Sequence, residues 1–300
     1  MLIIGITTIV WLGWLIARFS LAPVDTLSRH AESLSPQNLS ARLPNTRLPT
    51  ELSGLVLSFN GALERLEQSY LRLSTFNADV AHELRTPLGN LIGATEVALS
   101  RPRSNEELQD VMASNLEELE RLRTIINDML FLARAEQGEL AINQVPTSLA
   151  SEINKTAEFL DVIFEEHRNH LEVDGDALVL AEQSLLKRAL TNLLNNAVTH
   201  GRPDSTVKVE ITSDEKRVTL TVINRGPDIP AEDLPNLFNR FYRTSKERKN
   251  SDNNHGLGLA IVKAIIEMHN GEVFACSDNG IIKIGFHLPA YSVDNPQTID

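Results

Sequence analysis

The sequence contains a single cysteine, Cys276, so the chain cannot form an intrachain disulfide. That scarcity fits a protein that folds in a reducing compartment. An excess of basic residues is also missing, because 28 lysines and arginines stand against 40 aspartates and glutamates, for a net charge of −12. Such a chain lacks the basic surface of a nucleic-acid-binding protein, and we expect no nucleic-acid partner. The hydrophobic content of 42% can fill a core, which excludes wholesale disorder.

Charged residues are absent from the first 17 residues, MLIIGITTIVWLGWLIA. With the apolar residues that follow Arg18, this segment approaches the roughly 20 residues of a membrane-spanning helix. A secretory signal peptide is the alternative, but neither a positively charged start nor a small-residue cleavage site is present. We therefore predict a transmembrane helix over residues 1–22. The arginines that follow place the chain after residue 18 in the cytoplasm.

A heptad pattern dominates the middle of the chain. After a polar, proline-containing connector, apolar residues recur from Leu52 in alternating steps of four and three. This spacing is typical of a coiled-coil helix, which we expect to end near Leu99, before an Arg-Pro-Arg turn. A second heptad helix follows, opened by a capping box of Ser104 and Glu107. A hairpin with one apolar face cannot bury that face alone, so we predict a homodimer with a four-helix bundle.

The heptads stop after Gly138, and short β-type runs then alternate with helical runs up to residue 291. This pattern is that of one α+β domain of ordinary size, followed by a polar tail. We expect strands over residues 207–212, 218–223 and 281–287, and helices over residues 148–167, 183–200 and 257–268.

Residues 82–88 read HELRTPL and lie on the first heptad helix. His82 falls at heptad position f, away from the apolar seam, so its imidazole is expected to be hydrated and accessible. A neutral ring nitrogen is a competent nucleophile near pH 7. Glu83 is placed to take the ring proton, and the Thr86 hydroxyl, one turn on, is placed to orient a water. The heptad position alone is also compatible with a solvated histidine that has no function. The residues around His82 must therefore distinguish the two interpretations.

Two asparagines, Asn192 and Asn196, stand four residues apart in TNLLNNAVTH and share one face of a predicted helix. Amide oxygens at that spacing can reach one octahedral Mg²⁺ that keeps waters and phosphate oxygens in its other positions. We assign the metal contact to Asn196. A polar stripe on an amphipathic helix is the alternative interpretation.

Two glycine-containing segments follow along the chain. In VINRGPDIP, Gly226 permits a close backbone approach and Asn224 can bond an adenine amino group, although a simple Gly-Pro turn explains that segment alone better. In HGLGLAIVKAI, Gly256 and Gly258 open a helix whose bare amides can hold a phosphate, although a lone GxG is a weak signal.

Together these motifs resemble those of bacterial sensor histidine kinases. HELRTPL resembles their phosphoacceptor motif, and the longer run FNADVAHELRTPLGNL looks most like the heavy-metal (copper and silver) branch. The paired asparagines, the glycine turn, LFNRFYR and GLGLA, in that order, resemble the N, G1, F and G2 boxes of the kinase ATP-binding domain. The nucleotide-contacting residues that the resemblance implies are Asn192, Asn196, His200, Asn224, Gly226, Ile229, Phe238, Gly256, Leu257 and Gly258.

The resemblance implies a multidomain protein whose nucleotide domain is an α+β sandwich of the gyrase, Hsp90 and histidine-kinase type. It also implies that ATP and Mg²⁺ phosphorylate His82, that the phosphoryl group passes to an aspartate of a response regulator, and that the chain sits in the bacterial inner membrane. The expected regions are a transmembrane helix (1–22), a HAMP-like signal-relay linker (23–73), a dimerisation and phosphoacceptor hairpin (74–138), an ATP-binding domain (139–291) and a polar tail (292–300).

The sequence departs from the family pattern at several positions. The family usually has aspartate where Asn224 stands, and glycine at Asp228, Asn254 and Asn270. The Asn224 carbonyl still accepts a hydrogen bond, and we expect Asp228 to face solvent because a carboxylate aimed at a triphosphate would repel it. The segment 244–254 is polar and suits a lid, with Lys246, Arg248 and Lys249 as candidate phosphate contacts. An exposed flexible loop without a fixed contact is the alternative interpretation for each of these three side chains.

Three other functions compete with the kinase. An ATPase of the gyrase or Hsp90 type shares the nucleotide fold but has a glutamate where Asn192 stands, and asparagine is a poor general base. A dimeric signalling scaffold with an inactive nucleotide domain is the second, and a complete set of nucleotide motifs argues against it. A metal site at His167 and His170 is the third, and no further ligand cluster supports it.

Overall fold

The computed structural model describes residues 3–7, 9–15, 18, 40–42, 50–243 and 255–291, in two units, Met1–His82 and Glu83–Asp300. The long helix α2 (Thr50–Leu99) belongs to both units because it continues past His82. Much of the predicted linker, the polar tail and the predicted phosphate contacts Lys246, Arg248 and Lys249 lie outside the described residues.

In the first unit, residues 3–7 and 9–15 are helical and their side chains are almost all exposed. None of the helices in the described part of the chain combines the length and the apolar character that crossing a bilayer takes. The transmembrane helix expected over residues 1–22 includes residues outside the described ranges and stays a prediction. Further along, Arg42 forms an ion pair with Glu67 of α2, so two parts of the predicted linker region are in contact.

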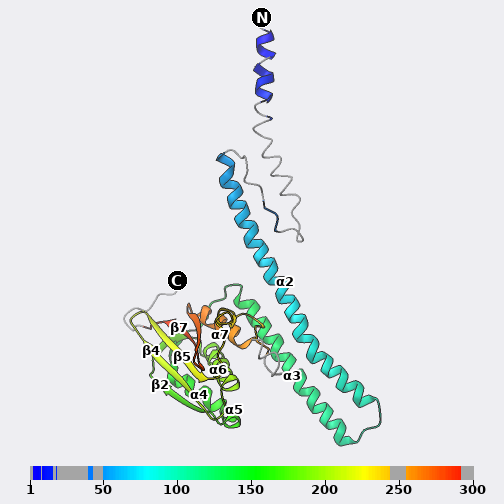
Figure 1. The fold of residues 1–300 in the computed structure, drawn as a ribbon, viewed down its shortest axis with the longest axis vertical. Coiled ribbons are helices and arrows are strands. Elements are labelled where there is room, and N and C mark those ends of the chain that lie inside the picture. Colours follow the sequence, from blue (N-terminus) through cyan, green and yellow to red (C-terminus); the bar gives the residue numbers. More distant parts are fainter. Residues whose placement is uncertain are drawn as a thin grey trace. The chain divides into compact units, whose positions relative to one another are not determined.

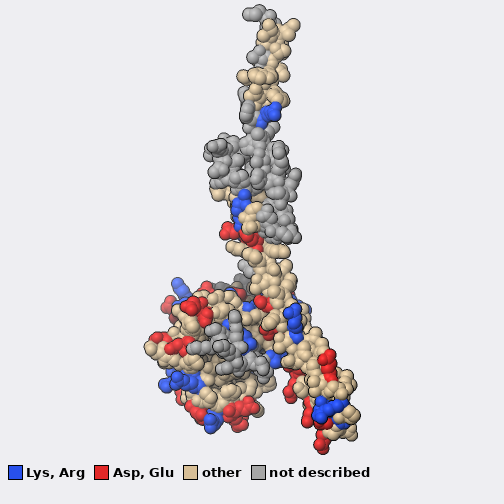
Figure 2. Space-filling model, turned by 45° about the vertical axis from the view of Figure 1, so that its right-hand side comes forward, with Lys and Arg blue, Asp and Glu red and all other residues tan. Residues whose placement is uncertain are grey.

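The predicted heptad hairpin is confirmed by α2 and α3 (Asn105–Ala135). Helix α2 ends at Leu99, as expected. The predicted capping box is present, because the Ser104 hydroxyl accepts from the Glu107 amide (3.1 Å) and the Ser104 amide donates to the Glu107 carboxylate (2.9 Å). Figure 2 shows acidic and basic side chains gathered together at the turn of this hairpin.

Two side-chain hydrogen bonds join the helices of the hairpin, which lie side by side in Figure 1. The Asn90 amide donates to the Glu118 carboxylate (3.1 Å), and the Asn115 amide donates to the Thr95 hydroxyl (3.2 Å). The apolar side chains of the hairpin remain largely exposed in the single chain. Those of the second unit are Leu88, Ile92, Val97, Leu99, Leu108, Met112, Leu116, Leu119, Ile126 and Leu130.

The α+β domain contains a five-stranded sheet in the order β2-β4-β5-β7-β6, in which only the β2–β4 pair is parallel. Strands β1 and β3 form a separate antiparallel pair. The strands are β1 (Val145–Ser148), β2 (His170–Asp174), β3 (Leu178–Ala181), β4 (Thr206–Ser213), β5 (Arg217–Arg225), β6 (Glu272–Asp278) and β7 (Ile281–Pro289). The helices are α4 (Leu149–Phe159), α5 (Asp161–His167), α6 (Gln183–His200), the short 3-10 helix η1 (Leu234–Asn236) and α7 (Gly258–Met268).

The core of this domain lies between the sheet and its helices, which stack against one face of it (Figure 1). Along β5 the buried residues alternate with more exposed ones, as expected for a strand with one covered face. Phe286 of β7 and Ile265 of α7 are fully buried. This two-layer packing fixes the ends of β5, β7 and α6, from which the candidate site is built.

The structure refines the predicted elements of the domain. The expected strands at 207–212, 218–223 and 281–287 are confirmed as β4, β5 and β7. The single helix expected over residues 148–167 is instead two, because Leu160 leaves the helical conformation (φ −98°, ψ 9°) and is buried, as is Phe164 four residues later. Strands β1, β2, β3 and β6 were not predicted.

His269, at the C-terminal end of α7, is a buried imidazole held as the neutral Nδ1–H tautomer. Its Nε2 accepts from the Glu182 amide (3.0 Å), and its Nδ1 donates to the Ile265 carbonyl (2.7 Å). Burial lowers the pKa of His269 below its ordinary value, against the opposing effects of the Ile265 carbonyl and the Glu182 carboxylate. The folded domain therefore disfavours protonation of this ring.

We expect the free energy of unfolding of this domain to fall as the pH drops below about 6.5. At such a pH the unfolded chain binds a proton at His269, whereas the buried imidazole of the folded domain does not. The stabilisation that the neutral His269 gives is complete above the pKa that this histidine has in the unfolded chain. It is lost as the pH falls from there through the lower pKa of the folded state. Thermal unfolding followed by circular dichroism at several pH values measures it. A His269→Gln protein should lose less stability over the same range; an identical pH dependence in both proteins would refute the assignment.

Candidate active site

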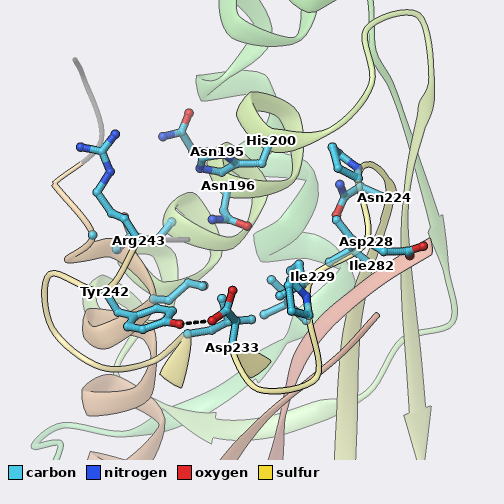
Figure 3. A pocket seen from close by; sticks show the side chains of 18 residues that line it. Asn195, Asn196, His200, Asn224, Asp228, Ile229, Asp233, Tyr242, Arg243 and Ile282 are labelled. Atoms are coloured by element: carbon cyan, nitrogen blue, oxygen red, sulfur yellow. Dashed lines mark hydrogen bonds between the residues drawn. The ribbon is translucent and has the colours of Figure 1, made fainter. Parts of the chain in front are cut away.

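A cavity of about 190 Å³ lies in the second unit, between α6, the ends of β5 and β7, and the start of α7 (Figure 3). Three of the predicted motifs, far apart in the sequence, meet there. The predicted residues that line the cavity are Asn192, Asn196, His200, Asn224, Ile229, Gly256 and Gly258.

Helix α6 supplies the polar side of the cavity. Its opposite face is buried in the core through Leu193, Leu194 and Ala197, so the 3.6-residue period turns Asn192 and Asn196 toward the cavity. Figure 3 shows the Asn196 amide pointing into the space. The asparagine pair is thus a cavity face and not only a polar stripe on the surface.

Close contacts require a glycine at position 256, before α7, and the glycine at position 258, which opens the helix, leaves space beside Asn192. Gly256 has φ +65°, and a Cβ there would lie 2.8 Å from the Phe241 carbonyl carbon. Phe241 itself has φ +58°, a conformation that is rare for a bulky residue, and its amide donates to the Gly256 carbonyl (2.9 Å). At Gly258 a Cβ would stand 3.4 Å from the Asn192 amide oxygen. A side chain at position 256 would clash with the backbone of Phe241 and Tyr242, whereas a Cβ at position 258 would touch Asn192 at ordinary contact distance and fill the space beside it.

Strands β5 and β7 supply the opposite, more apolar side. Asn224 pairs in register with Ile282, and both line the cavity with Ile284 and Ile229. The Asn224 side chain is buried, in keeping with a specific polar contact in an apolar setting. An apolar wall beside amides and bare glycines suits a ligand with a flat ring at one end and charged oxygens at the other.

Asp228 is exposed at the rim, and its carboxylate accepts from the Gly280 amide (2.6 Å). Figure 3 shows this carboxylate directed away from Asn196. The structure therefore keeps the negative charge that replaces the usual glycine at a distance from the polar side of the cavity, as expected from the sequence.

Three predicted residues do not line this cavity. Gly226 lies next to the cavity. A Cβ at this position would lie 2.9 Å from the side chain of Ile282, so a glycine here leaves room for that apolar residue of the cavity wall. Leu257 is buried in the core, and Phe238 lines a different, shallow depression at β6. Sequence reasoning had grouped both with the neighbouring motif residues.

Several lining residues were missed from the sequence: Asn195, Pro227, Asp228, Pro230, Asp233, Leu237, Tyr242, Arg243, Leu259, Ile282 and Ile284. The Tyr242 hydroxyl donates to the Asp233 carboxylate, a hydrogen bond drawn in Figure 3. The next residue, Arg243, adds a positive charge to the described lining of the cavity. Tyr242 and Arg243 directly follow the paired phenylalanines, so their position next to that motif was the available signal. Ile282 and Ile284 could be found only from the register of β7 against β5.

The predicted phosphoacceptor residues lie on α2. His82 and Thr86 are exposed, Glu83 is partly buried, and Pro87 within the helix is buried. The exposed ring agrees with the predicted outward heptad position of His82. The metal site considered at His167 and His170 gains no support, since the described residues contain no group of three or more histidine, cysteine or acidic side chains able to hold a metal ion.

Comparison with known families accounts for most of the chain. Residues 15–68 match the HAMP domain, residues 72–138 the His Kinase A (phospho-acceptor) domain, and residues 181–292 the Histidine kinase-, DNA gyrase B-, and HSP90-like ATPase family. The chain belongs to the sensor histidine kinases. The predicted multidomain architecture is confirmed at this level, and a kinase of this family carries both a phosphoacceptor hairpin and an ATPase-type domain.

Curated sensor histidine kinases resemble the chain over most of its length. It is 42% identical over 270 residues to "Sensor histidine kinase CusS" of Escherichia coli O6:H1, covering 90% of this chain and 56% of the relative. It is 38% identical over 274 residues to "Sensor protein CzcS" of Cupriavidus metallidurans, covering 91% and 58%. The predicted branch is borne out by these relatives, although the kinase chain spans little more than half of their length.

A solved structure supports the fold. The complex of histidine kinase ThkA with response regulator protein TrrA matches with a TM-score of 0.58 and 24% identity, over 76% of this chain and 65% of that one. At that identity the likeness concerns the fold of the kinase alone.

Proposed function

We propose that this chain is a protein-histidine kinase that uses ATP and Mg²⁺ to phosphorylate its own His82. One observation carries the proposal. A single cavity is lined by residues from three separate parts of the sequence, namely the asparagine pair, Asn224 and the glycines at the start of α7. The same chain carries an exposed histidine in HELRTPL. A nucleophile and a nucleotide site on one chain are the two parts that phosphoryl transfer to a side chain needs.

The lining residues fit ATP. Ile229, Ile282 and Ile284 form an apolar wall for the adenine ring, and the buried Asn224 amide is available to its amino group. The space that Gly256 and Gly258 leave open beside Asn192 suits phosphate oxygens at the N-terminus of α7. Asn196 would hold part of the coordination sphere of Mg²⁺, and the bound ion would neutralise negative charge on the phosphates.

In the proposed step, a ring nitrogen of His82 attacks the γ-phosphorus of ATP. A nitrogen–phosphorus bond forms, the bond from the γ-phosphorus to the bridging oxygen breaks, and ADP leaves with that oxygen. Glu83 accepts the proton that the ring loses. The exposure of His82 allows the ring to be reached, and the adjacent position of Glu83 supports its role.

The phosphoryl group then passes from His82 to an aspartate of a response regulator. Thr86 supports the reverse function, removal of phosphate from the regulator, by orienting a water. The regulator as partner is supported by family membership and by the ThkA structure, in which that kinase is in complex with response regulator protein TrrA.

We further propose that the kinase is a homodimer. The exposed leucine, isoleucine, valine and methionine side chains of the α2–α3 hairpin form an apolar surface that a second hairpin would bury as a four-helix bundle. The domain limits that we propose are 1–22, 23–73, 74–138, 139–291 and 292–300. The apolar start of the chain supports membrane anchoring with the cytoplasm after residue 18, and resemblance to the heavy-metal branch supports a metal stimulus.

An ATPase of the gyrase or Hsp90 type remains the competing activity. Asn192 occupies the position where those enzymes have the glutamate that activates water, and an amide cannot take a proton from water at neutral pH. Transfer to a side chain is therefore favoured over hydrolysis.

The direct test incubates the chain with γ-labelled ATP and Mg²⁺. We expect a protein-bound label that is lost in acid and kept in alkali, because a nitrogen–phosphorus bond behaves in that way. Release of inorganic phosphate without any protein-bound label would favour the ATPase, and failure to bind ATP would favour the inactive scaffold.

A further inference from the structure

A polar cluster in the second unit joins the nucleotide domain to the α2–α3 hairpin. His255, which directly precedes Gly256, lies at its centre. The Arg121 Nε of α3 donates to His255 Nε2 (3.0 Å), and His255 Nδ1 lies 3.3 Å from the Glu83 carboxylate. We call Glu83, Arg121 and His255 the relay cluster. Its side chains are only 15–24% exposed.

The hydrogen bonds of the relay cluster determine how the imidazole is protonated. Arginine can only donate, so Nε2 of His255 must accept and the ring proton of the neutral form sits on Nδ1. From there it points at Glu83, which can only accept when ionised. The imidazole thus presents a donor to Glu83 because Arg121 occupies its other nitrogen.

Five charged side chains lie around His255 and its immediate partners. Glu83 faces it from α2, Arg121 and Asp128 from α3, and Arg188 of α6 forms an ion pair with Asp128 at 2.5 Å. Arg121 is itself paired with Glu118 at 3.6 Å. Three acidic groups (Glu83, Asp128 and Glu118) and two basic groups (Arg121 and Arg188) therefore make up the charged surroundings of the ring.

The relay cluster is continuous with the nucleotide cavity through a short piece of backbone. Gly256, the next residue, lines the cavity, and its carbonyl accepts from the Phe241 amide (2.9 Å). A hydrogen bond and two left-handed residues therefore restrict the backbone on which His255 is mounted. A displacement of Gly256 by phosphate would be passed to His255 and on to Glu83.

Resting on the proposed function, we propose that His255 is a positioning residue for the phosphoryl transfer. Its Nδ1–H orients the Glu83 carboxylate, the group that takes the proton from the adjacent His82, and its backbone couples that carboxylate to the nucleotide cavity. A glutamate side chain has several rotatable bonds, so one fixed donor restricts it to fewer conformations. A donated hydrogen bond also favours the ionised carboxylate, which is the form able to accept a proton.

Two amide replacements separate the two nitrogens of the ring. In His255→Asn the side-chain nitrogen takes the place of Nδ1 and can still donate to Glu83. In His255→Gln the amide takes the place of Nε2, facing Arg121, and the donor to Glu83 is lost. We expect His255→Gln to lower the labelling rate at saturating ATP about tenfold, while His255→Asn stays within about threefold of the parent. The KM for ATP should change little in either, because the cavity residues are intact.

A double-mutant comparison tests whether the effect passes through Glu83. In a Glu83→Gln background, His255→Gln should cause no further loss, since the carboxylate that it orients is gone. The matched control is His170→Gln, which replaces an exposed imidazole on β2 and should leave the rate unchanged.

The possible outcomes are distinct. Equal rates for the parent and His255→Gln, a faster His255→Gln, an Asn variant as slow as the Gln variant, or losses that add in the double mutant would each overturn the positioning role. A parent protein without label on histidine would instead overturn the proposed kinase function, and this proposal with it.

Discussion

A His82→Gln chain is expected to lose the acid-labile label completely, to below about a thousandth of the parent level. Glutamine is similar in size and polarity but offers no nucleophilic ring nitrogen, so the acceptor is removed while the exposed surface of α2 is kept. The measurement is label retained on the protein after incubation with γ-labelled ATP and Mg²⁺. The matched control, His170→Gln, removes another exposed histidine and should label like the parent.

The same variant separates the kinase from the ATPase. If transfer to His82 is the reaction, the His82→Gln protein still binds ATP in its intact cavity but releases phosphate only at a background rate. Sustained ATP turnover by this variant would contradict the kinase and favour the ATPase. Label that persists at the parent level would show that another residue is the acceptor.

The second large effect is expected at the nucleotide cavity. Asn196→Ala should lower Mg²⁺-dependent labelling about 100-fold or more, because it removes the amide oxygen that we assign to the metal. The Asn196 side chain points into the cavity and not into the core, so the fold and the dimer should be unaffected. Labelling over a range of Mg²⁺ concentrations and sedimentation velocity measure the two properties separately.

The control for Asn196→Ala is Asn154→Ala, which removes an exposed amide from α4, away from the cavity. Unchanged labelling and an unchanged Mg²⁺ requirement in Asn196→Ala would exclude the metal role. A loss of labelling together with dissociation of the dimer would mean that the substitution acts on the structure and not on the ion.

The long helices and the central strands could be predicted because their signals are local. Heptad spacing, the Ser104 capping box and the alternation along β5 depend on residues a few positions apart, and all are present. Strands β1, β3 and β6 lack a clear apolar alternation, and β2 alternates over only five residues, so pairing with distant strands determines them. The break at Leu160 is likewise determined by burial of Leu160 and Phe164.

The cavity was predictable only where a motif signals it. Asn192, Asn196, Gly256 and Gly258 were found from spacing and resemblance, whereas Ile282 enters the cavity through its register with Asn224. Leu257 shows the converse limit. It stands between two glycines that line the cavity, yet the turn into α7 directs its side chain into the core.

His255 carries no signal in the sequence beyond its place before a glycine, and its contacts with Glu83 and Arg121 join residues that are 172 and 134 positions apart. Contacts of that separation follow from tertiary packing alone. The acceptor motif and the nucleotide motifs were therefore readable from the sequence, but the polar connection between Glu83 and the nucleotide cavity was not.

The central claim is that a nucleotide held by α6, β5 and α7 phosphorylates the histidine of HELRTPL. Mass spectrometry of the chain after incubation with ATP and Mg²⁺, under neutral to alkaline conditions that preserve phosphohistidine, tests it most directly. The account predicts one added phosphoryl group, located on His82. A phosphoryl group on any other residue, or none at all in a protein that binds ATP, would contradict it.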